Sequence, residues 1–454
     1  ACCSTRSVRR SVRMATKPVI PDAQRGNQLS KLLQLIACPI AVMCVWYTCE
    51  HLDGSFAKLF EKFYRDGLFT SLYRDIWGPV FFGTKAAWTI IGIYGGLELL
   101  FMKVLPGKMI NGPETINQNV PVYKANGQLA YVLTLFLYVV CSDLCIGLYP
   151  AGILYVYLGE ILGALNFFSM MLVLVLYFKG HYAPSDSDVL TRESFIADYY
   201  WGVELYPKIL GWHVKQFTNA RFGMMAWPIL LISYAARQYE IYGAVSDSMM
   251  VSVFLQFIYV STFFYYEEGY FFTMDIQHDR AGFYLCWGCL VWVPCVYTSP
   301  AMYLVHHPNH LGPVLSGGLV ALGLFCFWMK TNMNRQRYNV RDSDCKCTIW
   351  GKPPKVIRAK YTSMRGEVKE SVLLVCGWWG IACHFHYVGE ILGAFCWSWP
   401  ALFDNFLPYF YVAVLIALLV HRANRDDIRC AAKYGKYWKE YRKAVPYKIV
   451  PYVF

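Results

Sequence analysis

The sequence predicts an all-α protein, a bundle of about eight to ten helices that cross a membrane. Hydrophobic residues make up 56 % of the 454 residues and charged residues only 16 %, whereas a soluble domain has about a quarter charged residues. Apolar stretches recur along the whole chain, and about 20 apolar residues are enough for a helix to cross a bilayer. No Gly/Ser linker separates a second, soluble domain.

Ten candidate membrane spans follow one another along the chain. They lie at residues 31–49, 79–101, 128–149, 150–178, 224–236, 248–266, 281–305, 311–329, 372–400 and 407–420. Two of them, 224–236 and 407–420, reach bilayer length only if flanking residues extend them. Proline interrupts several spans, which membrane helices tolerate when neighbouring helices satisfy the freed backbone groups.

The net charge of +12 is unevenly distributed. Residues 330–371 carry 11 Lys and Arg against four acids, and residues 421–454 carry nine against three. By the positive-inside rule, both segments face the cytoplasm. These cations are tethered at a membrane surface and no nucleic-acid motif accompanies them, so a nucleic acid is not an expected partner. Membrane lipid is an expected partner.

The cysteines and the N-terminus predict no further site. Most of the 17 cysteines lie in apolar spans, where they act as small hydrophobic residues. Cys345 and Cys347 have no second pair at metal spacing, so we expect neither a zinc site nor a disulfide framework. Residues 1–29 are predicted to be a basic, disordered extension. They are not expected to be a secretory signal, because no apolar core follows the basic residues. Residues 30–454 are predicted to form the membrane domain.

The two basic segments contain side chains that suit a phosphate-bearing ligand with flat rings. Arg335, Arg337 and Arg341 fall within seven residues, and residues 421–454 add nine cations and seven aromatic side chains. Arginine is suited to bidentate contacts with phosphate, the group by which NADPH differs from NADH. No GxGxxG motif follows a predicted strand, so a Rossmann site is excluded.

A second signal is a group of titratable side chains between two spans. Residues 265–282 contain Glu267, Glu268, Asp275, His278 and Asp279. Such groups are costly in lipid and often line a cavity or a functional path, although an interfacial turn with its charges in headgroup water is the alternative. The i, i+3 spacing of Asp275 and His278 places both on one helix face. His278 and Asp279 lack partners for a metal site, so no metal is expected.

Three long runs resemble the sterol C14/Δ7 reductase family, to which lamin B receptor also belongs. They are GWWGIACHFHY, TMDIQHDRAGFYLCWGCLVWVP and HRANRDDIRCAAKYGKYWKEYRKAVPY, and the resemblance covers about residues 30–454. GVELYPK, VSDSM and PALFDNF resemble the plant and algal branch of the Δ7-reducing members. The resemblance implies a multi-pass protein of the endoplasmic reticulum that uses NADPH to reduce the Δ7 double bond of Δ5,7-sterols in sterol biosynthesis.

Two alternatives remain at this point: a sterol Δ14-reductase, and a weakly active or non-catalytic sterol-binding relative. The expected partners are a sterol and membrane lipid, with other enzymes of the sterol pathway as a further class.

The resemblance also implies an NADPH pocket within residues 330–454. The matching positions are Arg337, Arg341, Leu374, Trp379, His386, Tyr387, Arg422, Asp426, Cys430, Lys433, Tyr434 and Tyr441. The sterol is expected between this pocket and residues 265–282, entering sideways from the bilayer.

The chemistry requires an acid beside the sterol. A ring alkene has no carbonyl to polarise, so a proton must make the carbon electrophilic before hydride adds. Protonation of C7 would leave a tertiary cation at C8. Asp426 with Tyr441 is one candidate proton route, and Asp275 with His278 is the other.

Three residues depart from the family pattern. Cys383 stands where the family has an arginine, Asp342 is an acid beside Arg341, and Lys208 is a milder change from arginine. The resemblance therefore implies an active enzyme with weakened affinity for NADPH, because a cation near the cofactor is lost at Cys383.

Overall fold

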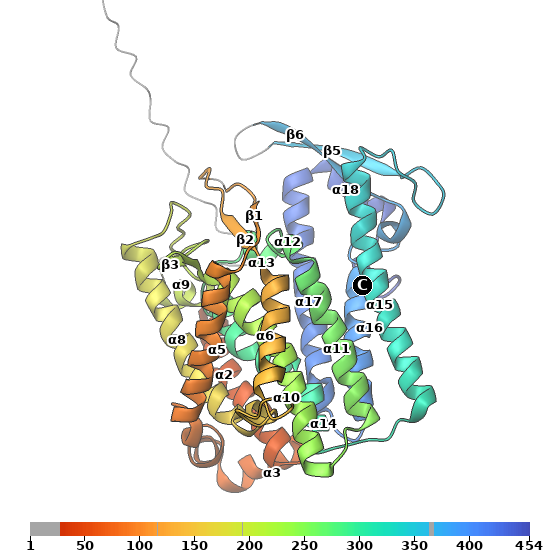
Figure 1. Cartoon of the computed structure of the whole chain (residues 1–454). Coiled ribbons are helices and arrows are strands. Elements are labelled where there is room, and N and C mark those ends of the chain that lie inside the picture. The colour runs from red at the N-terminus through yellow and green to blue at the C-terminus, as the bar shows by residue number, and fades with distance from the viewer. Residues whose placement is uncertain (1–27, 116, 193, 363–366) are drawn as a thin grey trace, which may run out of the picture.

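Seven helices among the described residues are long and apolar enough to cross a membrane, and they run side by side in one bundle (Figure 1). They are α2 (Gln28–His51), α5 (Lys85–Val104), α8 (Leu158–Tyr182), α11 (Asp247–Tyr265), the consecutive pair η4 (Phe283–Tyr297) and α14 (Ser299–Leu304), α15 (Gly312–Asp342) and α17 (Leu407–Tyr434). The computed structural model describes residues 28–115, 117–192, 194–362 and 367–454. The predicted polytopic helical bundle is confirmed, whereas nearly all of the predicted extension at residues 1–29 lies outside the described residues.

Three more helices complete the bundle at the remaining predicted spans: α6 (Gly127–Cys141), α10 (Met224–Tyr242) and α16 (His386–Ser398). One predicted boundary is wrong. The span expected at 372–400 begins with the end of a strand and a short 3-10 turn, and its helix starts only at His386. At about 1.5 Å per residue, 13 residues of α16 reach about 20 Å, less than the hydrocarbon thickness of about 30 Å.

Short elements connect the long helices. The short helices are α3 (Phe56–Asp66), α4 (Leu68–Ser71), η1 (Leu72–Ile76), η2 (Gly78–Val80), α7 (Ile153–Val156), α9 (Phe195–Trp201), η3 (Gln216–Gly223), α12 (Glu267–Tyr270), α13 (Met274–Gln277), η5 (Gly377–Gly380), η6 (Trp399–Ala401) and α18 (Lys436–Ala444). The strands form three antiparallel hairpins, β1 (Lys108–Asn111) with β2 (Val122–Ala125), β3 (Lys208–Ile209) with β4 (Trp212–His213), and β5 (Val356–Thr362) with β6 (Val368–Leu374).

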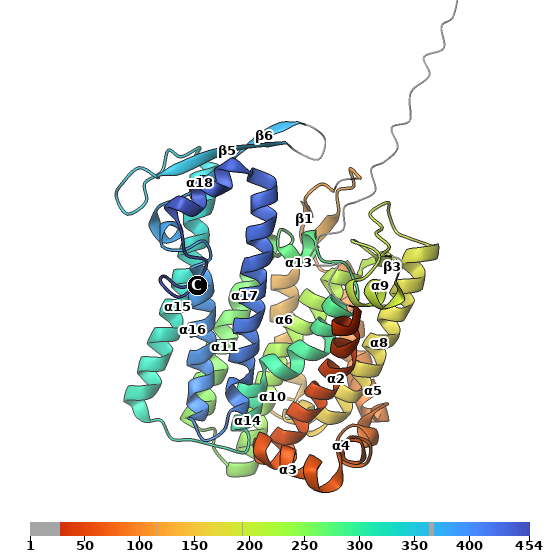
Figure 2. The ribbon, with the colours of Figure 1, turned by 180° about the vertical axis from the view of Figure 1, so that it is seen from behind.

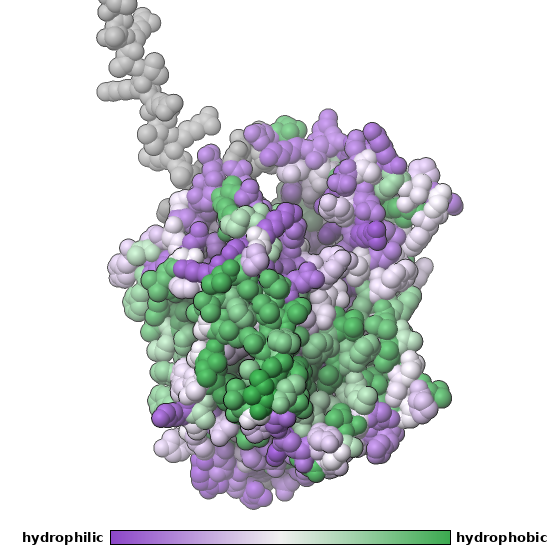
Figure 3. All heavy atoms as spheres, viewed as in Figure 1, coloured by the Kyte–Doolittle hydropathy of each residue, from purple (hydrophilic) through white to green (hydrophobic). Residues whose placement is uncertain are grey.

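The surface is divided into bands along the bundle axis. On the face shown in Figure 3, hydrophobic residues cover the middle and hydrophilic residues cover both ends. The hairpin β5–β6, helix α18 and the loops at α12 and α13 lie together at one end (Figure 1). We call this the basic end, because the two predicted basic segments meet there.

Helix α17 is central to the arrangement. Seen from behind, it runs through the middle of the bundle beside α16 and reaches the basic end next to α13 (Figure 2). Its first half packs in the apolar core through Tyr411, Leu415 and Leu419. Its second half carries the charged residues of the C-terminal segment, so one helix connects the membrane core to the site described below.

Two of the bundle segments, η3 and η4, are π-helices that pack against each other. Pro294 in η4 cannot donate a backbone hydrogen bond, which disfavours a regular α-helix there. The close approach depends on Gly223, because a Cβ atom at this position would lie 2.3 Å from the backbone oxygen of Cys289. This crossing holds the residues before η3 against the loop after α13.

Candidate functional site

Residues 275–279 bind one face of helix α17. They comprise the end of α13 and the two residues after it, and we call them the loop of residues 275–279. Three arginines spaced three and four residues apart share a helix face, and each contacts a residue of this loop. The contacts are Arg422 Nη2 to Asp275 Oδ1 at 2.6 Å, Arg425 Nη2 to Asp279 Oδ1 at 2.7 Å, and Arg429 Nη1 to His278 Nε2 at 2.7 Å. The shared face predicted for Asp275 and His278 is therefore directed toward α17, and the titratable loop and the C-terminal segment meet in one site.

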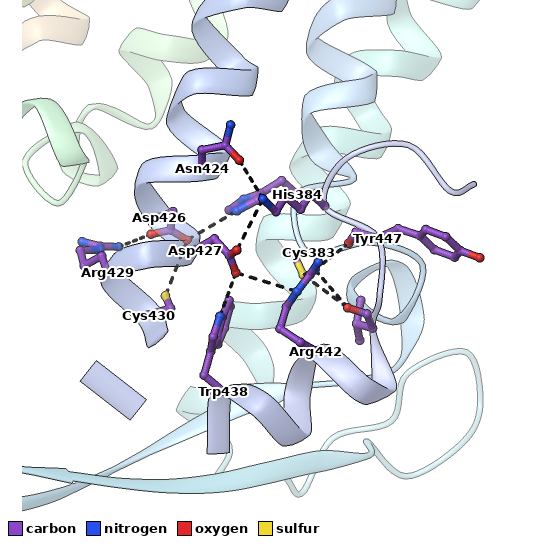
Figure 4. Close-up of polar contacts among 12 residues, drawn as sticks. Cys383, His384, Asn424, Asp426, Asp427, Arg429, Cys430, Trp438, Arg442 and Tyr447 are labelled. Carbon is purple, nitrogen blue, oxygen red and sulfur yellow. Dashed lines mark hydrogen bonds and ion pairs between the residues drawn. The ribbon is translucent and has the colours of Figure 1, made fainter. Parts of the chain in front are cut away.

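Asp426 connects this network to residues 383–387, which we call the CHFHY segment. Its carboxylate accepts a hydrogen bond from Arg429 at 2.5 Å and one from the Cys430 thiol at 3.8 Å, and His384 Nε2 lies 3.5 Å away (Figure 4). Burial lowers the pKa of His384, with Asp426 opposing the effect only in part. His384 is therefore neutral at pH 7, and its imidazole lies beside the carboxyl group of Asp426.

Asp426 and Tyr441, predicted to form one proton route, have different partners in the structure. Among the described residues, the polar partners of Asp426 are Arg429, Cys430 and His384. Tyr441 is buried instead, with its ring stacked on Trp438 at 4.8 Å between centroids. Helix α18 folds back over β5, so the Tyr441 ring joins the apolar cluster beneath the hairpin rather than the carboxylate.

Cys383 has a guanidinium beside it, although it stands where the resemblance places an arginine. Arg442 Nη1 donates to the Cys383 sulfur at 2.9 Å (Figure 4). Burial raises the pKa of the Cys383 thiol, so the sulfur is neutral. The cation predicted to be lost at Cys383 is therefore present nearby, carried by α18.

Rings form a continuous path from α15 to Asp426. The Arg337 guanidinium lies 4.7 Å from the centroid of Trp379, and the Trp379 ring lies 5.4 Å from His386. His386 contacts Tyr387 at 4.4 Å, and Tyr387 stacks on His384 at 5.1 Å. Four residues predicted for cofactor binding thus lie side by side, and this path ends at the imidazole that contacts Asp426.

The remaining predicted residues lie around this path. Leu374 packs in one buried cluster with Trp379. Lys433 Nζ lies 4.2 Å above the ring of Tyr361 on β5, and Tyr434 contacts the same ring at 5.6 Å. Arg341 is exposed at the end of α15. Lys433 and Tyr434 therefore lie at the hairpin, at the rim of the site rather than at the path of rings.

Lys215 is a site residue that the sequence analysis missed. Its ammonium donates to the backbone oxygens of Ile276 at 2.7 Å and Asp279 at 2.6 Å. Burial lowers its pKa to about 7, while burial raises the pKa of Asp279. No local pattern distinguishes Lys215 within the polar residues 180–223, because its role depends on the packing of η3 against the loop.

A half-buried polar group on three neighbouring helices was also missed. Glu390 Oε1 accepts hydrogen bonds from Tyr259 at 3.0 Å and from Lys330 at 2.8 Å. The three residues come from α16, α11 and α15, and Lys330 also lies 4.6 Å from the centroid of the Tyr259 ring. The signal that could have found them is the rarity of charged residues in apolar spans.

Known proteins similar to this chain are sterol reductases. A model of the family described as "Ergosterol biosynthesis ERG4/ERG24 family" matches residues 22–454. The 7-dehydrocholesterol reductase of Arabidopsis thaliana is 50 % identical over 427 residues, which cover 94 % of this chain and 97 % of that protein. The Delta(14)-sterol reductase of Methylotuvimicrobium alcaliphilum is 34 % identical over 435 residues, 94 % of this chain and 96 % of that protein. The 7-dehydrocholesterol reductase of Danio rerio is 33 % identical over 438 residues, 93 % of this chain and 90 % of that protein.

Proposed function

The chain belongs to the ergosterol biosynthesis ERG4/ERG24 family of sterol reductases, and we propose that it uses NADPH to reduce the Δ7 double bond of a Δ5,7-sterol. The identity of 50 % with a relative named 7-dehydrocholesterol reductase, against 34 % with a relative named Delta(14)-sterol reductase, favours the Δ7 bond. The chain is a multi-pass membrane protein, and we propose the endoplasmic reticulum as its location. Other enzymes of the sterol pathway remain a proposed class of partner.

A reductase of this kind uses a nicotinamide cofactor, and the side chains present fit NADPH. Arg337 combines a guanidinium with a ring face, since it lies 4.7 Å from the Trp379 centroid, and Arg341 is exposed on the same helix. These cations would hold phosphate groups, while Trp379, His386 and Tyr387 would hold flat rings. When bound, NADPH supplies the hydride.

The proton must come from a side chain on the sterol side of this site. His278 is unsuitable as a cationic acid, because burial and the nearby Arg429 lower its pKa to about 4. Asp275 is held by Arg422 at 2.6 Å. Asp426 lies 3.5 Å from the imidazole of His384, through which a proton can be exchanged. We therefore assign the proton to Asp426 and a positioning role to Asp275.

Expression in a host that accumulates a Δ5,7-sterol tests the reaction. Reduction of the Δ7 bond removes the conjugated diene, so we expect its ultraviolet absorbance to disappear and the sterol profile to shift to Δ5-sterols. A parallel assay with a Δ8,14-sterol tests the alternative Δ14-reductase. Consumption of the Δ8,14-sterol with the Δ5,7-diene unchanged would contradict the proposal, and conversion of neither would indicate a non-catalytic sterol-binding protein.

The roles of the two carboxyl groups are distinguished by the variants Asp426→Asn and Asp275→Asn, each assayed for turnover and for NADPH binding. General acid catalysis contributes about 100-fold to 10,000-fold, so we expect Asp426→Asn to lose at least about 100-fold in kcat. Asp275→Asn leaves Arg422 without its partner and should mainly weaken binding of the cofactor or sterol. Near-normal turnover of both variants would show that neither residue supplies the proton.

A further inference from the structure

A cavity of about 470 Å³ lies on helix α15. It is on a different side of the helix from Arg337, where the path of rings begins. It is lined by Trp328, Asn332, Arg335, Asn339, Thr348 and Trp350, together with Gln336 and Ile349. Arg335 and Arg337 are two residues apart, so they point about 200° apart around a helix of about 3.6 residues per turn. The arginines that the sequence grouped together are thus divided between two sites, and the volume is within the range of small-molecule sites.

The cavity continues a stripe of side chains that faces the membrane. Phe325 and Trp328 are apolar and about half exposed, at 50 % and 55 %. Asn332, Arg335 and Asn339 follow at spacings of three and four residues, so they continue the same face of α15. The stripe changes from apolar to polar toward the basic end, as a lipid changes from acyl chain to headgroup. Helix α15 lies at the edge of the bundle, where this face can meet lipid (Figure 1).

The polar side chains in the cavity have unused donors. Among the described residues, Arg335 has no carboxylate partner, whereas Arg358 at the same end contacts both Asp344 and Glu370. Asn332 Oδ1 accepts a hydrogen bond from Trp378 Nε1 at 3.0 Å, which fixes the orientation of the amide. Its amide nitrogen is left as a donor. An unpaired guanidinium beside an oriented amide is suited to a phosphate oxygen.

The far wall of the cavity holds a tryptophan in a strained turn. Trp350 has φ +50° and Gly351 has φ +76°, and Ile349 and Lys352 exchange backbone hydrogen bonds at 2.8 and 3.1 Å across them. Such two-residue turns favour Asn or Gly at the position that Trp350 occupies. The Trp350 side chain is nonetheless 61 % exposed. Tryptophan is enriched at membrane–water interfaces. The strained turn therefore holds a side chain suited to the interface against the cavity.

We propose that this cavity binds the headgroup of an anionic phospholipid. Arg335 and Asn332 bind the phosphate, Trp328 and Trp350 flank the glycerol region, and the acyl chains follow the exposed face of α15 past Phe325. A free phosphate compound offers the same oxygens but no acyl chains. The apolar half of the stripe favours the lipid.

Native mass spectrometry of the full chain in detergent tests the proposal. The probes are dioleoyl phosphatidylserine, dioleoyl phosphatidylcholine and the soluble headgroup glycerophosphoserine. We expect the wild-type protein to retain one phosphatidylserine in preference to phosphatidylcholine, and Arg335→Gln to weaken this retention roughly tenfold, as expected for a lost charged hydrogen bond. The matched control is Arg358→Gln, which removes the same charge from the same end and should leave retention unchanged.

A second variant separates lipid binding from folding. Trp350→Asn relieves the strained turn but removes the ring contact with Trp378 at 5.4 Å between centroids, so its thermal stability in detergent should stay close to that of the wild type, while phosphatidylserine retention falls. Equal loss of lipid in Arg335→Gln and Arg358→Gln, or unchanged retention in both Arg335→Gln and Trp350→Asn, would overturn the proposal. Binding of glycerophosphoserine as tight as that of the lipid would overturn it as well. These readouts do not depend on reductase activity.

Discussion

Arg442 holds the end of the chain against the candidate site. Besides the Cys383 sulfur, its guanidinium donates to the backbone oxygens of Val445 at 3.2 Å, Tyr447 at 3.3 Å and Pro446 at 2.7 Å. The backbone nitrogen of Cys383 in turn donates to the Tyr447 oxygen at 3.0 Å. One cation therefore ties residues 445–447, which follow α18, to the CHFHY segment. A second cation at position 383 would be placed directly beside it.

This arrangement predicts that Arg442→Gln raises the KM for NADPH and lowers the thermal stability in detergent. The variant removes donors to four acceptors, and a hydrogen bond to a charged group contributes about 1.5–3 kcal/mol. Cys383→Arg alone should also destabilise the protein, because two guanidinium groups would meet. The double variant should recover part of both losses.

The matched control for these variants is Lys443→Gln, which removes an exposed charge from the same helix. Strictly additive effects of Cys383→Arg and Arg442→Gln on stability and KM would contradict a direct interaction between these positions.

At the residue scale, the relative positions of side chains within one helical turn could be predicted from the sequence. The positions of side chains that meet because the chain reverses direction could not. The i, i+3 spacing of Asp275 and His278 correctly predicted one shared direction, because helix geometry fixes it. The position of Tyr441 depended on how α18 turns back after Gly435, whose φ of +54° permits the reversal. Spacing along the chain carries no information about that turn, so Tyr441 was expected beside Asp426, where the structure has His384.

At the element scale, the crossing of the two π-helices positions Lys215 against the loop of residues 275–279. This crossing predicts that Gly223→Ala is destabilising, because the added Cβ would lie 2.3 Å from the backbone oxygen of Cys289, which cannot move away without distorting η4. Overpacking of this kind costs about 1–3 kcal/mol. The measurement is the thermal unfolding midpoint in detergent, with turnover as a second readout.

Gly96→Ala is the matched control for this prediction. Gly96 is also in a bundle helix, α5, but a Cβ there would meet no atom within 4 Å. Alanine is favoured over glycine in a helix interior by about 1 kcal/mol, so this variant should be as stable as the wild type or slightly more stable. Equal midpoints for Gly223→Ala and the wild type would show that the two π-helices can separate without cost.

The sequence identified every helix of the bundle but misjudged the segment at 372–400. Apolar length is a sound signal for a span, since a bilayer requires a long apolar helix. It fails at 372–385 because these residues are apolar for another reason: Leu373 and Leu374 belong to β6 and pack beneath the hairpin, and Trp379 supports Arg337. Apolar composition alone does not distinguish a buried hairpin and turn from the start of a helix.

At the scale of the whole molecule, the two basic segments and the titratable loop converge at one end of the bundle. Arg422 and Asp275 are 147 residues apart in the sequence, yet their side chains lie 2.6 Å apart. The excess of Lys and Arg predicted that both basic segments lie on one side of the membrane, and the fold agrees, since β5–β6 and α18 lie together (Figure 2). The loop joins them because α11 ends at the same side as α17.

The same charge distribution predicts which end of the bundle faces the cytoplasm. Residues 330–371 and 421–454 contain 11 and nine cations, so the positive-inside rule places the basic end in the cytoplasm. Strand β6, which carries Lys369, and helix α3, which carries Lys58, lie at opposite ends of the bundle (Figure 1). The two lysine side chains are similarly exposed, at 51 % and 52 %. In sealed microsomes with the cytoplasmic face outward, a membrane-impermeant maleimide should label Lys369→Cys at once and Lys58→Cys only after detergent is added. The wild-type protein, which has its own cysteines, supplies the background in both conditions. Labelling of Lys58→Cys in intact vesicles, with Lys369→Cys protected, would place the candidate site on the lumenal side, where the supply of cofactor and the orientation of the sterol would both have to be reconsidered.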